Sequence, residues 1–213
     1  MDIAGADQPV AARLVGAIME VVPAPKGFAV CAGGTTLRAA LRARDIQAIG
    51  CGAGIHFAPD RLPFGTGSLS LICCCPPPTG DSWALVREWA RVVKPGGVVG
   101  LAVRVAPPEP AAARYVAALE GLLHGFAGQL LNSYEWVACF EDAGLVCRVQ
   151  EALAARVALR SLNPMPDAET LIRARVLLRQ APPAVARWLE PELTEGAESF
   201  LRHTLILVGT RTG

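Results

Sequence analysis

The amino-acid sequence predicts one α/β domain, and three observations support this class. The chain has 213 residues, which suit one compact domain and would fill two sparsely. Hydrophobic residues make up 52% of it and charged residues 18%, so it can bury a sizeable core and is too apolar for a disordered chain. Clusters of Pro and Gly separate short apolar runs at intervals typical of alternating strands and helices.

The first third of the chain predicts a helix, a strand and a glycine-rich turn. Residues 10–21 place apolar side chains at helical spacing. Residues 28–31 predict a short buried strand, and residues 32–36 predict a tight turn in which a threonine can cap the next helix. Residues 46–49 are a second strand candidate and residues 55–58 a possible third. The five residues between these two are too few for a parallel crossover, so either they form a hairpin or one of them is not a strand.

The middle of the chain predicts a strand, a helix and another strand. Residues 69–75 form an uninterrupted apolar run, which favours a strand buried on both faces. Asp81 or Ser82 is expected to cap the next helix, and residues 94–97 to end it with a cation, a proline and two glycines. Residues 98–103 then predict a second interior strand.

The last third predicts two helices and two late strands. The helices are expected over residues 111–129 and 134–143, and the strands over residues 145–149 and 204–208, where they close the sheet. Between these strands, residues 151–200 are polar and contain prolines that mark corners. This segment predicts a helical insertion, or lid, before the last strand.

Charge and cysteine content disfavour several classes of protein. Lys and Arg exceed Asp and Glu by one, and the pI is near 7.6, so no overall field attracts nucleic acid or anionic lipid. Seven cysteines without a C-x-x-C pair do not indicate a secreted disulfide framework. The sequence shows neither a signal-peptide pattern nor an apolar run of the ~20 residues that a membrane span needs. We expect a cytoplasmic protein with neither nucleic acid nor a membrane as its partner.

Several motifs of the chain resemble those of one enzyme family. Residues 62–64, LPF, followed by residues 87–97, REWARVVKPGG, are similar to the segments LPF and RVLKPGG of class I S-adenosylmethionine-dependent methyltransferases of the ubiquinone/menaquinone-biosynthesis type. Residues 140–145 resemble the end of a later helix of that family, and residues 205–211 its closing strand. The match is good over residues 62–149 and poor in the N-terminal third.

The resemblance implies a Rossmann-like methyltransferase fold over residues 1–213, with a mostly parallel sheet and helices on both faces. Only residues 34–61 are available for a helix and for the second and third strands, and the second helix of the family does not fit there. We therefore expect the sheet to be truncated at the edge formed by those strands. The resemblance also implies S-adenosylmethionine as cofactor and a small-molecule acceptor.

The family's cofactor site lies at the strand ends, where glycines let the backbone approach the cofactor and a carboxylate accepts hydrogen bonds from the ribose hydroxyls. The cofactor-binding residues implied here are Ala32, Gly33, Gly34, Cys51, Asp60, Leu62 and Cys75. The acids expected at the ends of the first and second strands are missing. Ala58 stands at the adenine-contacting position, with Asp60 close by, and Ser70 replaces a third aspartate. The cofactor site is therefore degenerate in its N-terminal half, and we predict neither a catalytic residue nor a metal site.

Some candidate residues have a structural as well as a functional interpretation. Gly33 and Gly34 can cradle a cofactor or form an ordinary turn, whereas residues 49–54 favour a glycine-rich hairpin. Cys73–Cys75 suggest a metal-thiolate site, but alternate side chains of a strand point to opposite faces, which favours packing in the sheet. Cys75 can still line a pocket because it ends its strand.

We expect structural roles for most histidines, tryptophans and arginines of interest in the chain. Three histidines are expected at the surface or in packing: His56, His124 and His203. Of these, His124 is the best candidate for another role, since its helix lies near the expected mouth of the site. Three tryptophans are expected in the core or at an interface rather than in an aromatic cage: Trp83, Trp89 and Trp136. Six arginines favour a solvated insertion, with a lid over an acidic substrate as the alternative: Arg156, Arg160, Arg173, Arg175, Arg179 and Arg187.

Two functions remain open. The first is methyl transfer from S-adenosylmethionine to a small molecule, with residues 105–135 and 151–200 covering the acceptor. The second is a non-catalytic, methyltransferase-like subunit that has lost the cofactor site and binds a protein partner; a homodimer is compatible with both. Loss of a ribose carboxylate removes hydrogen bonds worth ~1.5–3 kcal/mol each, or roughly ten- to a hundredfold in affinity. A NAD(P) enzyme is disfavoured because no complete G-x-G-x-x-G precedes an acid.

Overall fold

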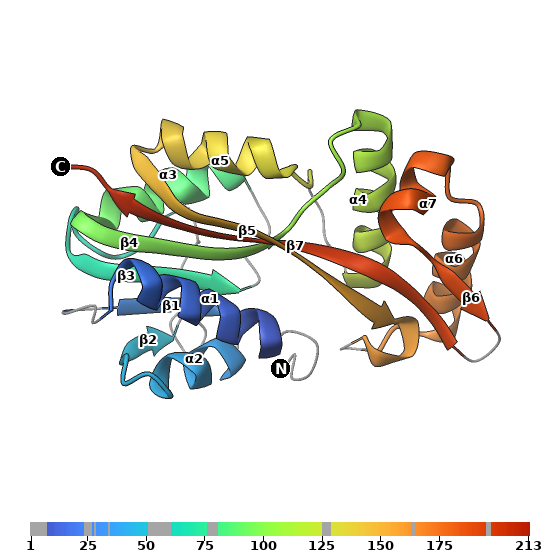
Figure 1. Cartoon of the computed structure of the whole chain (residues 1–213), viewed down its shortest axis with the longest axis horizontal. Helices are drawn as coiled ribbons and strands as arrows, with labels where there is room; N and C mark the ends of the chain where they lie inside the picture. The colour runs from blue at the N-terminus through green and yellow to red at the C-terminus, as the bar shows by residue number, and fades with distance from the viewer. Residues whose placement is uncertain are drawn as a thin grey trace.

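In the part of the chain that the structure describes, a seven-stranded sheet forms the centre, in the order β2-β1-β3-β4-β7-β5 with β6 beside β7 (Figure 1). The structure is a computed structural model that describes residues 8–23, 27, 29–33, 35–50, 61–75, 81–124, 129–162, 165–194 and 197–213. The strands are β1 (Ala29–Gly33), β2 (Ala48–Gly50), β3 (Leu69–Cys75), β4 (Val93–Arg104), β5 (Leu145–Ala158), β6 (Glu192–Thr194) and β7 (Ala197–Arg211). The helices are α1 (Gln8–Val21), α2 (Thr35–Arg42), α3 (Ser82–Val92), α4 (Pro110–His124), α5 (Ser133–Asp142), α6 (Ala168–Arg179) and α7 (Pro183–Leu189).

The strands of this sheet run mostly in one direction. β2, β1, β3 and β4 pair in parallel, whereas β7 is antiparallel to β4, β5 and β6. The predicted α/β fold with a mostly parallel sheet is therefore confirmed. Among the described residues β2 is the edge strand on one side, as expected for a sheet shortened there. The possible strand at residues 55–58 lies outside the described residues.

The middle of the chain matches its prediction at β3 and at the start of α3, whereas the prediction that residues 94–97 form the end of the helix is wrong: α3 ends at Val92, and these residues belong to β4, which is longer than the predicted strand over residues 98–103. β3 covers the predicted residues 69–75, and its side chains are buried along its whole length. Asp81 is the N-cap of α3, and its carboxylate accepts hydrogen bonds from the backbone N–H groups of Trp83 (2.9 Å) and Ala84 (3.2 Å). These two hydrogen bonds satisfy backbone N–H groups that the first turn of a helix leaves without a partner.

The two late strands are much longer than predicted. β5 and β7 pair from Leu145 opposite Arg211 to Ala158 opposite Ser199. They extend into both ends of the 151–200 segment, whose helical part consists of α6, α7 and a short 3₁₀ turn, Leu159–Ser161. Residues 152–158 in the second half of β5 are mostly alanine, which has a low strand propensity, so this half depends on pairing with β7 for its strand character.

Helices cover both faces of the sheet, as predicted. α3 and α5 lie on one face and α1 and α2 on the other (Figure 1). We call the two layers the upper core, which includes Trp89, Val103 and Phe140, and the lower core, which includes Ile18 and Leu37. Glycines let both layers pack closely against the strands. A Cβ at Gly100 would lie 2.9 Å from Ile18 Cδ1, and a Cβ at Gly209 would lie 2.7 Å from Phe140 Cδ1.

A third cluster, the end core, joins α4, α6 and α7 to the far ends of β5 and β7. Its buried members include Leu119, Leu178, Val185 and Phe200. In Figure 1 the arrowhead of β3 points toward this group, so the carboxyl ends of the parallel strands face it. Within the ranges given above, each helix is too short or too polar to cross a membrane.

Candidate functional site

The carboxyl ends of β1 and β3 lie side by side. Gly33 pairs in register with Cys75, and Ala32 pairs with Cys74. Ligands of open parallel sheets bind beyond this edge, where glycine permits a close approach of the backbone. The structure therefore brings together three of the seven predicted cofactor-binding residues, Ala32, Gly33 and Cys75. Gly34, Cys51 and Asp60 lie outside the described residues.

Leu62 is packed beside α3. Its side chain is buried in the upper core, whereas Cys75 belongs to the lower core. The N–H of Leu62 donates a hydrogen bond to Glu88 Oε1 (2.7 Å), and Arg91 Nη2 donates to the carbonyl oxygens of Leu62 (3.4 Å) and Phe64 (3.0 Å). These contacts give Leu62 a structural role, and its part in cofactor binding stays a prediction.

A cation lies at the carboxyl end of β2. Arg38 of α2 packs against Gly50, because a Cβ on that glycine would be 3.0 Å from Arg38 Nη1. A ribose diol would need a hydrogen-bond acceptor at this strand end, and the guanidinium supplies only donors. Gly33 would therefore allow a bound S-adenosylmethionine to approach the backbone closely. Among the described residues, the end of β2 presents Arg38 and supplies no carboxylate to bind the ribose hydroxyls.

The cysteine run is divided between the two faces of the sheet. Cys74 lies in the upper core, while Cys73 and Cys75 lie in the lower core with Cys31. This arrangement confirms the predicted packing role. A hydrogen bond with Cys73 lowers the pKa of Cys31, and the same bond together with burial raises the pKa of Cys73. Within the described ranges, no group of three or more His, Cys, Asp or Glu side chains is placed to hold a metal.

A buried carboxylate and two guanidiniums meet next to the carboxyl end of β4. Glu120 of α4 accepts a hydrogen bond from Arg104 Nη1 on Oε2 (2.6 Å) and one from Arg202 Nε on Oε1 (3.3 Å). Nη2 of Arg202 lies 2.6 Å from Nε2 of His124, which is 3.7 Å from Glu120 Oε2. The exposed side-chain fraction is 6% for Glu120, 9% for Arg202, 15% for His124 and 22% for Arg104. We call these four residues the Glu120 cluster.

The Glu120 cluster has an excess of positive charge. Burial and the neighbouring guanidiniums of Arg104 and Arg202 together outweigh the carboxylate of Glu120 and lower the pKa of His124 to about 4. The imidazole is therefore neutral at pH 7, and its Nε2 accepts the hydrogen bond from Arg202. Burial alone would raise the pKa of Glu120, but Arg104 and Arg202 hold it below its usual value. Two guanidiniums, one carboxylate and a neutral imidazole give a formal charge of +1.

Of these four residues, only His124 is a candidate predicted from the sequence. Glu120 lies one turn before His124, and the two residues stand within the otherwise apolar run VAALEGLLH. An acid at that position of an amphipathic helix is a signal for a buried ion pair. Arg104 and Arg202 carried no such signal, since their approach depends on the pairing of β4 with β7.

The other predicted histidine and tryptophan positions are structural. The ring of His203 stacks on Trp188 with centroids 3.9 Å apart, and its Nε2 lies 2.7 Å from the carbonyl oxygen of Trp188. Trp89 and Trp136 are buried in the upper core and Trp83 packs against it, as predicted. His56 lies outside the described residues.

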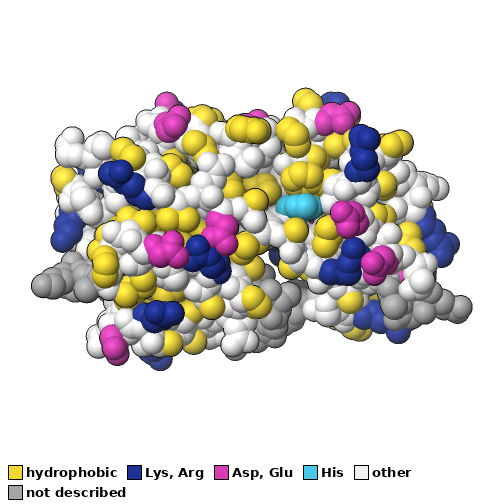
Figure 2. All heavy atoms as spheres, viewed as in Figure 1, with side chains coloured by type: hydrophobic (Ala, Val, Ile, Leu, Met, Phe, Trp, Pro, Cys, Tyr) yellow, Lys and Arg dark blue, Asp and Glu magenta, His cyan; other side chains and the backbone are white. Residues whose placement is uncertain are grey.

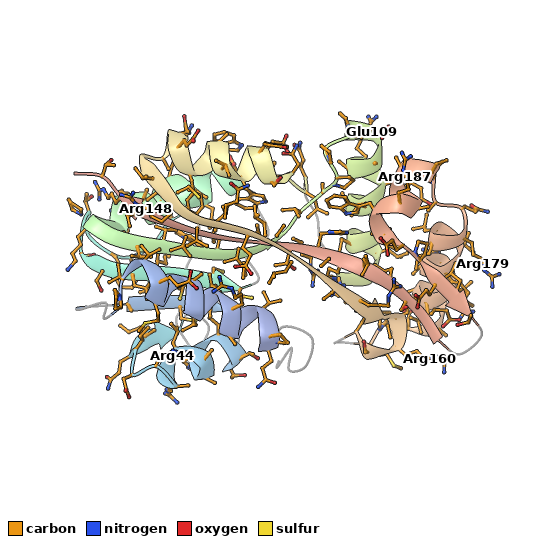
Figure 3. The ribbon with its side chains drawn as sticks, in the orientation of Figure 1. Arg44, Glu109, Arg148, Arg160, Arg179 and Arg187 are labelled. Carbon is orange, nitrogen blue, oxygen red and sulfur yellow. The ribbon has the colours of Figure 1, made fainter. Side chains whose placement is uncertain are left out.

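The arginines of the 151–200 segment divide into paired and outward-facing groups. Arg156, Arg173 and Arg175 form ion pairs with acids, among them Arg175 Nη2 with Glu198 Oε1 at 2.7 Å. The three others lie on the outer side of the end core in Figure 3: Arg160, Arg179 and Arg187. This arrangement favours the solvated interpretation over a lid that binds an acidic substrate.

Cavities lie at both ends of the sheet. One of about 650 Å³ follows the carboxyl end of β4, between Pro107–Pro110, α4 and the start of α5, and is lined in part by Arg114, Asn132 and Glu135. Two others, of about 670 and 890 Å³, lie near the amino ends of the parallel strands, beside Gly96 and Gly27 respectively. Figure 2 shows that the surface is also hollowed between the part over α1 and α2 and the part over α6 and α7. The first cavity and this hollow lie on the side where such folds bind ligands.

Known protein families and curated protein sequences give no match to the chain. Solved structures do match it. A candidate methyltransferase from Bacillus halodurans aligns with a TM-score of 0.81 at 14% identity, over 94% of this chain and 99% of that one. The YcgJ protein from Bacillus subtilis aligns with a TM-score of 0.75 at 17% identity, with the same coverage. The geranyl diphosphate C-methyltransferase of Streptomyces coelicolor, solved with S-adenosyl-L-homocysteine, aligns with a TM-score of 0.53 at 14% identity over 99% of this chain and 86% of that one.

The chain therefore has the Rossmann-like fold of class I S-adenosylmethionine-dependent methyltransferases. The likeness to the Bacillus halodurans protein covers nearly the whole of both chains, so the fold includes α4, α6 and α7 as well as the sheet. At these identities the likeness defines the fold, and the activity has to be argued from the site.

Proposed function

We propose that the protein binds S-adenosylmethionine and transfers its methyl group to a small-molecule acceptor. The observation that carries this proposal is the full-length match of the fold to a candidate methyltransferase, together with the pairing of Gly33 and Cys75 at the ligand-binding edge of the sheet. The whole chain would then act as one domain in the cytoplasm, with residues 151–200 as its lid.

The residues proposed to hold the cofactor are the seven implied by the family resemblance: Ala32, Gly33, Gly34, Cys51, Asp60, Leu62 and Cys75. When bound, S-adenosylmethionine supplies a methyl group on a sulfonium, which a positioned nucleophile can accept without a covalent enzyme intermediate. The chain's own part is to align the two reactants and to exclude water. Residues 105–135, which include the wall of the 650 Å³ cavity, would cover the acceptor.

A second function, that of a non-catalytic binding subunit, is favoured by one observation. Arg38 stands at the carboxyl end of β2, where a ribose-binding carboxylate would serve the cofactor. In that case the domain would keep the methyltransferase fold as a surface for a protein partner or for a second copy of itself.

Calorimetric titration of the full chain with S-adenosylmethionine and S-adenosylhomocysteine separates the two functions. The methyltransferase proposal expects saturable binding, with dissociation constants from the micromolar range up to about a hundredfold weaker, as the lost carboxylate predicts. Absence of heat at millimolar ligand would reject that proposal and favour the binding subunit.

A further inference from the structure

The geometry of the Glu120 cluster points to a binding site for an oxyanion. We propose that Arg104 binds a negatively charged oxygen-bearing group, a carboxylate or a phosphoryl group, of the acceptor. This inference rests on the proposed function for the identity of the ligand as a methyl acceptor. The binding of an oxyanion itself can be tested separately.

Arg104 stands at the right place for this role. It is the last residue of β4 and pairs with Thr204 of β7. Ala102 belongs to the lower core. Because side chains two residues apart on a strand share a face, Arg104 lies on the same face of the sheet as Ala102, at the end of β4. In this fold class the carboxyl ends of the strands are where ligands bind.

The Arg104 guanidinium donates only part of its hydrogen bonds within the described part of the protein. Nη1 donates to Glu120 Oε2, whereas Nε and Nη2 have no hydrogen-bond partner among the described residues. The side chain is 22% exposed, so these donors are not sealed in the core. Two adjacent N–H donors in a planar fork match the two oxygens of a carboxylate or phosphoryl group.

Glu120 fixes this fork in position. The carboxylate is 6% exposed and is held on its other oxygen by Arg202, so the Arg104 end of the pair has little freedom. Burying a guanidinium costs solvation free energy that one shared carboxylate compensates only in part. The formal charge of +1 of the cluster means that an entering anion would be attracted rather than repelled.

A purely structural tie between β4 and α4 is the competing explanation of these contacts. It predicts that removal of Arg104 lowers stability and changes nothing in anion binding. The oxyanion site predicts a change in binding that depends on the fork and on the charge of the cluster.

The test is calorimetric titration of the full chain with sodium phosphate, sodium pyrophosphate and sodium benzoate. We expect saturable binding of at least one probe with a dissociation constant of about 1 mM or below. Arg104→Gln should weaken it about tenfold or more, and Arg104→Lys should give an intermediate value, because it keeps the charge and loses the fork. Arg44→Gln removes the same charge at a distant site and is the matched control (Figure 3). Preference for phosphate or for benzoate identifies the chemical source of the oxyanion.

Glu120→Gln is an independent variant that should change the affinity for the probes in the opposite direction to Arg104→Gln. The amide oxygen of the glutamine can still accept from Arg104 and keep the fork in place, while the formal charge of the cluster rises by one, so binding should become severalfold tighter. Equal affinities in the native chain, Arg104→Lys and Glu120→Gln would overturn the proposal even if Arg104→Gln does not fold, as would the absence of saturable binding for all three probes. Titration with S-adenosylhomocysteine in the same samples keeps the two proposals apart. Binding of an oxyanion probe without binding of S-adenosylhomocysteine would reject the methyltransferase proposal and support the oxyanion site.

Discussion

Glu88 and Arg91, one turn apart on α3, form an ion pair that holds the segment before β3. Nη2 of Arg91 lies 2.6 Å from Glu88 Oε1, and the same two side chains bind the backbone of Leu62 and Phe64. This pair fixes the LPF segment of the family resemblance against α3, the helix that precedes the KPGG motif at the start of β4. The two motifs are therefore linked in space as well as in sequence.

Glu88→Gln should destabilise the protein by about 1–3 kcal/mol, because Arg91 would lose a charged partner and the N–H of Leu62 a strong acceptor. Urea unfolding followed by far-UV circular dichroism measures this change. The matched control is Glu169→Gln, which removes a carboxylate from the exposed Glu169–Arg173 pair of α6 and should change the free energy of unfolding by less than about 0.5 kcal/mol. Equal effects of the two substitutions would show that the Glu88 pair has no special role.

His124 should make stability depend on pH. Its pKa is about 4 in the folded protein, because burial and the facing guanidiniums of Arg104 and Arg202 outweigh the facing carboxylate of Glu120. In the unfolded chain the imidazole would bind a proton near its ordinary pKa of 6.5. The contribution of His124 to the free energy of unfolding is therefore fully present above pH 6.5. It is lost as the pH falls toward 4, at up to about 1.4 kcal/mol per pH unit.

His124→Gln keeps an acceptor for Arg202 and removes the titration. The difference in free energy of unfolding between pH 7 and pH 5 should therefore be smaller in this variant than in the native chain. Urea unfolding at both pH values measures it, and a titration of the His124 imidazole by NMR checks the pKa directly. An unchanged pH dependence together with an imidazole pKa near 6.5 would contradict the assignment.

The layered fold is predictable from the sequence wherever local signals are strong. β3 and the Asp81 cap follow from a seven-residue apolar run and from a polar residue before a helix, and both signals lie within a few residues of the element they define. The second half of β5 was missed, because residues 150–158 become a strand only by pairing with β7, about 50 residues away in the chain. The Glu120 cluster was missed for the same reason, since Arg104 and Arg202 meet Glu120 through tertiary contacts.

Gly97→Ala should destabilise the protein by about 1–3 kcal/mol through overpacking. A Cβ there would lie 2.6 Å from Val93 Cγ1, 2.9 Å from the carbonyl oxygen of Lys94 and 3.0 Å from that of Ser70, and backbone atoms cannot move away easily. Gly65→Ala is the matched control, because its Cβ would meet no atom within 4 Å. Thermal unfolding of both variants measures the difference. A Gly97→Ala variant as stable as Gly65→Ala would show that β4 relaxes at its start without cost.

Arg38→Glu should strengthen binding of S-adenosylhomocysteine if the strand ends hold the cofactor as proposed. The native guanidinium lies against Gly50 at the end of β2 and offers no acceptor to a ribose diol, whereas a carboxylate on the same helix position can accept from both hydroxyls. One such hydrogen bond is worth ~1.5–3 kcal/mol, so the expected gain is roughly tenfold or more in affinity. Arg42→Glu makes the same charge change one turn further along α2, away from Gly50, and should alter the affinity by less than about twofold. Calorimetric titration of both variants decides the matter. Equal gains would mean that charge alone acts at long range, and a loss of affinity in Arg38→Glu would place the ribose elsewhere than at the end of β2.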